Sequence, residues 1–81
     1  MNNEFVIDQE MQMKIEDSIH SGIQEHLYDE LIEYLIRQKY KTPSKELAIQ
    51  RQRDSKPLEF QEYNAYCERA KMRAKQILGL N

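Results

Sequence analysis

Apolar residues recur at every fourth position through the first half of the chain, from Met11 to Leu35. This spacing is typical of an α-helix with one side packed against a core. A repeat of four drifts against 3.6 residues per turn, so the stripe would wind around a single straight helix. A break at Gly22 removes the drift and predicts two helices, over residues 8–20 and 22–39. The alternative is one long helix kinked at Gly22.

Polar residues next to these segments support the division into two helices. Asp8 is a good N-cap for the first helix, because its carboxylate can accept a hydrogen bond from a backbone N–H group. Ser21 and Gln24 have the spacing of a capping box, which predicts that they open the second helix.

The second half of the chain predicts two further helices, over residues 43–53 and 57–78. Thr42-Pro43 is typical of a helix start, because threonine caps well and proline suits the first helical position. Gly79 is a typical residue just beyond a helix end. Apolar residues of the last segment recur in steps of three and four, at Phe60, Tyr63, Cys67, Ala70, Ala74 and Ile77. This is a heptad seam, and its small residues allow another helix to approach closely.

These segments predict an all-α protein, a small bundle of three to four helices, with residues 8–81 as its single domain. A chain of 81 residues is short, and a domain of this size buries only about 60% of its unfolded surface. Residues 1–7 are predicted to be a flexible N-terminal arm. The alternative is that Phe5, Val6 and Ile7 dock on the body of the domain.

The latter half of the second helix is apolar on nearly every side, whereas a helix that faces one core and water needs only one apolar stripe. In so short a chain this pattern predicts neighbours on both sides, one of them a second copy of the protein. We therefore expect a homodimer, with a self-association surface formed by Leu31, Ile32, Leu35 and Ile36.

Charge is divided unevenly along the chain. Residues 1–33 contain nine acids and one base, for a net charge of −8, and residues 34–81 contain eleven bases and five acids, for +6. The second helix carries an acidic face made of Glu25, Asp29, Glu30 and Glu33. We expect this face to pair with the bases that flank the last seam, within one chain or between two, or to contact a basic protein partner.

Nucleic-acid binding is the competing hypothesis, because the second half has enough bases to contact several phosphates. The residues that would carry it are Arg51, Arg53, Arg69 and Arg73. Lys71 and Lys75 fall on one side of the last seam and Arg69 and Arg73 on the other. This arrangement favours charge pairing over one broad basic face.

Candidate chemistry is sparse, so we do not expect an enzyme. The two histidines, His20 and His26, are six residues apart, and the single cysteine, Cys67, is distant in sequence. The sequence predicts no catalytic residue, no metal site, no cofactor and no small-molecule substrate. It also lacks an apolar run of the roughly 20 residues that span a membrane. We expect a cytoplasmic regulatory or accessory protein, of a kind that viruses and mobile elements encode.

Overall fold

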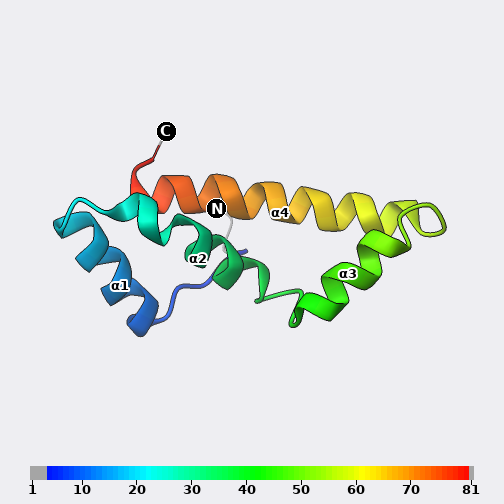
Figure 1. The fold of residues 1–81 in the computed structure, drawn as a ribbon, viewed down its shortest axis with the longest axis horizontal. Helices are drawn as coiled ribbons and strands as arrows, with labels where there is room; N and C mark the ends of the chain where they lie inside the picture. Colours follow the sequence, from blue (N-terminus) through cyan, green and yellow to red (C-terminus); the bar gives the residue numbers. More distant parts are fainter. Residues whose placement is uncertain (1–3, 81) are drawn as a thin grey trace.

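The computed structural model describes residues 4–80, and its regular elements over that range are four helices and no strand. They are α1 (Gln9–His20), α2 (Gln24–Ile36), α3 (Pro43–Arg51) and α4 (Pro57–Leu78), as Figure 1 shows. The predicted all-α fold is confirmed. None of these helices is long and apolar enough to cross a membrane.

The longest helix, α4, forms one side of the molecule along its whole length (Figure 1). Its 22 residues correspond to about 33 Å of helix. The helix α2 packs against α4 more extensively than any other element does. The helix α1 lies near the C-terminal end of α4, and α3 lies near its N-terminal end (Figure 1). The result is an elongated molecule of 46 × 25 × 20 Å, with α1 and α3 at opposite ends.

Two of the predicted helix starts have the expected side-chain caps, and α4 begins at Pro57 without one. The Asp8 carboxylate accepts a hydrogen bond of 2.8 Å from the Met11 amide. The Thr42 hydroxyl oxygen accepts one of 3.2 Å from the Lys45 amide, and Pro57 is the first residue of α4. Predicted helix ends were less accurate, because α2 stops at Ile36 and α3 at Arg51, short of the predicted residues 39 and 53.

The predicted capping box at the start of the second helix is wrong. Ser21 is the C-cap of α1, and Ile23 precedes α2 without any side-chain cap. Gly22 has a left-handed φ of 71°, the Gly22 amide donates to the Ile19 carbonyl, and the Ile23 amide donates to the Ser18 carbonyl. These are the two hydrogen bonds of a Schellman motif. The turn therefore ends α1, and it also excludes one long helix through Gly22.

A self-association surface was predicted on the second helix because its apolar residues were expected to be too many for one short chain to cover. The observed core contradicts this reason. Leu31 and Leu35 are 0% exposed and Ile36 is 9% exposed, whereas Ile32 is half-buried. Their cover comes from the same chain: two residues of α1, one of the turn after α2, and five of α4. These are Met11, Ile15, Tyr40, Tyr63, Tyr66, Ala70, Ala74 and Leu78. Three of the four predicted surface residues are thus core residues, and dimerisation stays a prediction that needs another surface.

The segment predicted as a flexible arm is docked on the bundle over its described residues. The Phe5 ring lies 5.2 Å from the Tyr66 ring. The Val6 amide donates to the Gln38 side chain, and the same side chain donates back to the Val6 carbonyl, at 3.0 and 2.7 Å. The Glu4 carboxylate pairs with the guanidinium of Arg69 at 2.7 Å. The docked alternative therefore holds for residues 4–7, and residues 1–3 lie outside the described part.

The buried stripe of α4 differs in part from the predicted seam. Tyr63, Ala70 and Ala74 are buried as expected, whereas Phe60, Cys67 and Ile77 are only half-buried. Tyr66 and Leu78 take part in the core instead. The stripe is rotated because α4 packs on α2 along most of its length and meets α3 only near its start.

Candidate interaction surfaces

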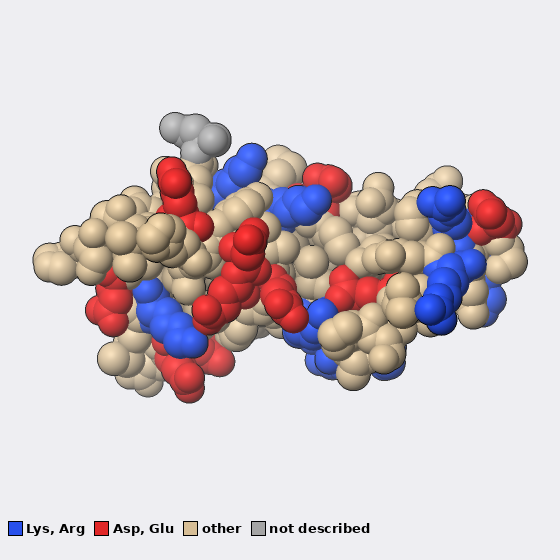
Figure 2. Space-filling model, in the orientation of Figure 1, with Lys and Arg blue, Asp and Glu red and all other residues tan. Residues whose placement is uncertain are grey.

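Acidic side chains gather over α1 and α2. Residues 8–36 contain eight acids and a single base, Lys14. Figure 2 shows these acids on the part of the surface formed by the first two helices, while Lys and Arg side chains cluster at the far end near the turn from α3 to α4. The strong charge asymmetry of the sequence therefore survives, in part, as an asymmetry of the folded surface.

A hollow of about 340 Å³ opens between α1 and α2. Two residues of the predicted acidic face, Glu30 and Glu33, line it together with Asp8, Glu10, Met11, Lys14 and Tyr34. Lys14 donates a hydrogen bond of 3.0 Å to Glu30, and this bond raises the pKa of the lysine. Among the described residues that line the hollow, the single base is thus already paired, and four carboxylates against one ammonium give a net charge of −3.

The remaining two residues of the predicted face extend this surface along α2. Glu25 and Asp29 are both exposed. Steps of four residues along a helix turn by only about 40°, so Glu25, Asp29 and Glu33 follow one side of α2. We call the exposed side made by Glu25, Asp29, Glu30 and Glu33 the acidic surface.

Within one chain, this surface does not pair with the bases of α4, and pairing between two copies stays a prediction. Glu30 pairs with Lys14, and Glu33 pairs with Arg37 at 3.4 Å, both within the first half of the fold. On α4, Arg69 pairs with Glu4, and Lys71 approaches Glu68 of its own helix at 3.7 Å. Among residues 4–80, no salt bridge joins the acidic surface to α4.

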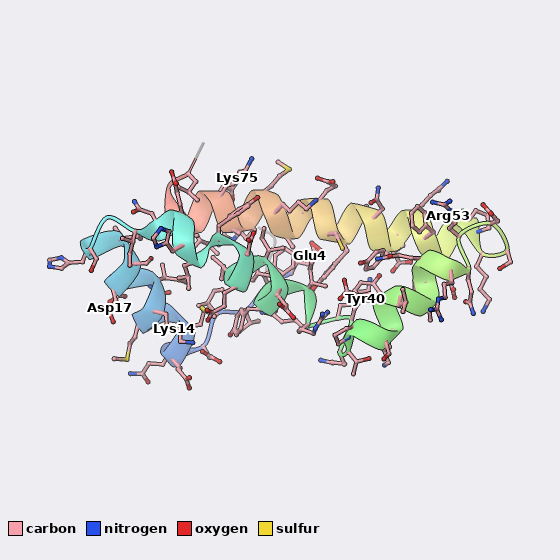
Figure 3. All side chains as sticks on the ribbon, viewed as in Figure 1. Glu4, Lys14, Asp17, Tyr40, Arg53 and Lys75 are labelled. Atoms are coloured by element: carbon pink, nitrogen blue, oxygen red, sulfur yellow. The ribbon has the colours of Figure 1, made fainter. Side chains whose placement is uncertain are left out.

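The four arginines of the nucleic-acid hypothesis do not share one surface. Arg51 and Arg53 lie at the α3–α4 turn, where Figure 3 labels Arg53. Arg73 lies 16 residues beyond the first residue of α4, which corresponds to about 24 Å along the axis. The guanidinium of Arg69 is held by Glu4 and stacks 5.6 Å from the Tyr66 ring. Two pairs of arginines at this separation make two small basic sites rather than one broad face.

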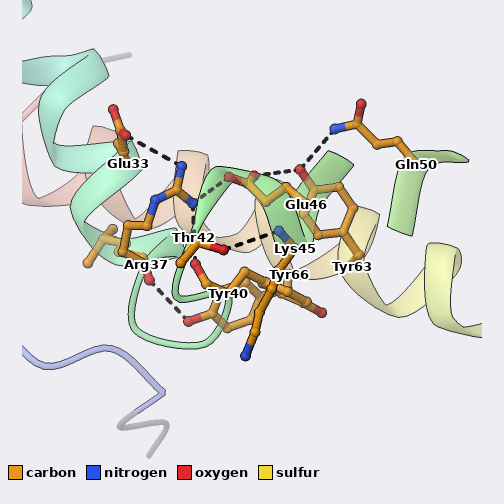
Figure 4. Close-up of polar contacts among 10 residues, drawn as sticks. Glu33, Arg37, Tyr40, Thr42, Lys45, Glu46, Gln50, Tyr63 and Tyr66 are labelled. Atoms are coloured by element: carbon orange, nitrogen blue, oxygen red, sulfur yellow. Dashed lines mark hydrogen bonds and ion pairs between the residues drawn. The ribbon is translucent and has the colours of Figure 1, made fainter. Parts of the chain in front are cut away.

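A polar network fixes α3 to the rest of the molecule (Figure 4). The carboxylate of Glu46 accepts hydrogen bonds from the guanidinium of Arg37 and, at 2.6 Å, from the Tyr63 hydroxyl. Gln50 donates to the same hydroxyl at 3.3 Å. The side chains of Glu46 and Arg37 are 16% and 24% exposed, and α3 contributes no buried residue. Polar contacts therefore hold this helix where apolar packing is thin.

Three buried tyrosines lie between α2, α3 and α4, and we call them the tyrosine cluster: Tyr40, Tyr63 and Tyr66. Their rings meet edge to face at centroid distances of 5.0 and 5.5 Å. Burial raises the pKa of each phenol above its ordinary value, and the bond to Glu46 raises that of Tyr63 further. The Tyr66 hydroxyl donates to the Leu35 carbonyl at 3.1 Å. These contacts give the cluster a structural role.

A groove of about 420 Å³ lies beside α3, and no pattern of residues predicted it. Its buried and half-buried lining residues, which we call the floor, are Ile36, Phe60, Tyr63 and Cys67, and its exposed ones, which we call the rim, are Gln50, Arg53, Asn64 and Lys71. Burial raises the pKa of the Cys67 thiol, which disfavours the reactive thiolate. None of its lining residues in the described part of the chain is a carboxylate. Sequence patterns could not locate it, because it depends on how α3 is tilted against α4.

Over residues 4–80, no group of three or more His, Cys, Asp and Glu side chains is arranged to hold a metal ion. No protein-family model, curated protein or solved structure matches this chain. What the chain binds is therefore inferred from its own surfaces.

Proposed function

We propose that this chain is a non-enzymatic regulatory or accessory protein that acts by binding another protein. Its partner is a basic protein, and the contact is the acidic surface of α2 with the adjoining hollow. The hollow is the main support for this proposal, because four of its seven described lining residues are carboxylates and the one base among them is already paired with a carboxylate.

An aromatic residue at this surface adds an apolar contact to the charge. Tyr34 lines the hollow and is half-buried, with its hydroxyl accepting a hydrogen bond of 3.0 Å from the Asp8 amide. Tyrosine offers a rigid apolar face with a polar tip, and it is enriched at protein interfaces. A surface of this charge repels phosphates, so a basic protein fits it better than a nucleic acid does. A cytoplasmic location is part of the proposal, since Cys67 is a free thiol.

The test is affinity capture by the full chain from nuclease-treated host lysate, followed by mass spectrometry. The variant Glu25→Gln/Asp29→Asn removes two charges from the acidic surface at exposed positions. Its control, Asp54→Asn/Glu59→Gln, removes two charges at the opposite end of the molecule. We expect wild type and control to retain the same basic protein, and the acidic-surface variant to lose it.

Two further measurements complete the experiment: capture at raised salt, and binding of DNA or RNA. Charge attraction at an exposed surface is screened over about 8 Å at physiological ionic strength, so capture should weaken when salt is raised. Equal capture by both variants would contradict the proposal. Binding of DNA or RNA that falls steeply with salt and is lost in Arg51→Gln/Arg53→Gln would instead support the nucleic-acid hypothesis.

A further inference from the structure

The groove beside α3 combines an apolar floor with a basic rim. Ile36, Phe60 and Cys67 present apolar atoms at its base, and Arg53 and Lys71 stand at its edge. Among residues 4–80, no carboxylate lines it, although Glu68 lies 3.7 Å from Lys71 on the same helix and offsets part of that charge. A helix with acidic residues on either side of an apolar side chain would complement this groove in shape and charge.

The outer side of α1 has this composition. Met13 is 58% exposed, and Glu16 and Asp17 follow it at positions i+3 and i+4, on the same side of the helix. Ile19, also exposed, borders this side. Among residues 4–80 nothing covers the outer side of α1, because the inner side packs Met11 and Ile15 into the core.

The outer side of α1 and the groove beside α3 lie at opposite ends of the molecule. Figure 3 shows Asp17 on α1 at one end and Arg53 beyond α3 at the other. Residues 37–62, at the α3 end, contain seven bases and four acids, for +3, and the remaining described residues contain five bases and ten acids, for −5. Two copies related by a two-fold axis across the 46 Å length would therefore bring each negative end against a positive one.

We propose that the chain self-associates through this groove, with α1 of each copy seated beside α3 of the other. Met13 enters the apolar floor, and Glu16 and Asp17 face Arg53 and Lys71. Two equal contacts form in each dimer, as in other two-fold assemblies. This surface replaces the one predicted on the second helix, and it leaves the acidic surface of α2 to the basic partner, so neither proposal depends on the other.

Charge reversal tests the pairing directly. The α1 variant is Glu16→Lys/Asp17→Lys, and the groove variant is Arg53→Glu/Lys71→Glu. Each places like charges together at both contacts of its own dimer. We expect each to raise the dimer dissociation constant at least tenfold, measured by light scattering coupled to size-exclusion chromatography. Lys56→Glu/Lys75→Glu is the control for the groove variant, since neither lysine lines the groove.

Mixing the two variants is the decisive step. In a heterodimer, the reversed α1 meets the reversed groove and the native α1 meets the native groove, so both contacts are attractive again. We expect an equimolar mixture to recover the wild-type dissociation constant within about threefold, while far-UV circular dichroism shows that both variants are folded. A wild-type mass of 9.8 kDa at 200 µM would overturn the proposal. So would a mixture that stays monomeric, or variants that dimerise like wild type.

The basic-partner proposal and the self-association proposal can be contradicted independently of each other. Glu25→Gln/Asp29→Asn should leave the dimer dissociation constant unchanged, because neither residue lines the groove or lies on α1. A change in dimerisation with this variant would place the interface on α2 and overturn the assignment to the groove.

Discussion

Replacement of Glu46 by glutamine should release α3 while the rest of the fold stays intact. No side chain of α3 is buried, and its nine residues are fewer than the roughly 12–15 that an isolated helix needs to be even marginally stable in water. Its attachment depends on the Glu46 carboxylate, which accepts hydrogen bonds from Arg37 and Tyr63. Glutamine keeps the shape of the side chain but loses the charge and one acceptor oxygen.

The size of the effect follows from those two bonds. Hydrogen bonds to a charged group contribute about 1.5–3 kcal/mol each. Part of this is lost to solvent screening, because the Arg37 side chain is 24% exposed, and glutamine can still accept one bond. We therefore expect a cost of about 2 kcal/mol, which corresponds to a roughly 30-fold fall in the protection of α3 amides against hydrogen exchange.

Native-state hydrogen exchange, resolved by peptide, is the assay, and Glu33→Gln is the control. Glu33 bonds to the same guanidinium, but its side chain is 65% exposed and the distance is 3.4 Å, so its loss should cost under about 0.5 kcal/mol. Unchanged protection of Pro43–Arg51 in Glu46→Gln would refute the reasoning. An equal loss in α2 and α4 would also refute it, since the fold would then open as one unit.

Three further predictions concern the core. Phe5→Ala should lower the free energy of unfolding by about 2 kcal/mol in urea titrations, roughly half the cost of deleting a fully buried ring, whereas the neighbouring Val6→Ala should change it little because Val6 is 67% exposed. Ala70→Leu should cost about 1–3 kcal/mol by overpacking, since Ala70 is 0% exposed, and exposed Ala65→Leu should leave the melting temperature unchanged. Stability should fall with alkaline pH: the raised pKa values of the tyrosine cluster mean that the folded chain keeps protons which the unfolded chain loses above about pH 10. A urea midpoint that is equal or higher at pH 11 than at pH 9 would contradict this.

Local signals in the sequence were enough to predict the four helices. Asp8, Thr42 and Pro57 mark helix starts by their own chemistry, and Gly79 ends α4 with a φ of 70°. The error at Ser21 shows the limit of such signals. A serine before a glycine can open one helix or close another, and the choice was decided by backbone hydrogen bonds to Ser18 and Ile19, which the spacing of polar residues does not reveal.

The residues that bury the apolar side chains of α2 could not be predicted, because they come from segments distant in sequence. Its apolar residues do face several directions, as predicted, but α1, α4 and residues 4–7 enclose most of them. The docking of Phe5 on Tyr66 joins residues 61 positions apart, and no local pattern specifies it. The same holds for the ion pair of Glu4 with Arg69, which takes up one of the α4 bases predicted as partners for the acids of α2.

Folding changes what the charge asymmetry can do. Because α4 runs back alongside α2, it returns four bases to the acidic end, and the −8 and +6 of the two sequence halves become −5 and +3 at the two ends. These ends lie far apart along a 46 Å axis, well beyond the screening length of about 8 Å in physiological salt. The charge of each end is therefore screened from the other. We propose that the acidic surface of α2 binds a basic partner, and that two other surfaces, the outer side of α1 and the groove beside α3, join two copies of the chain.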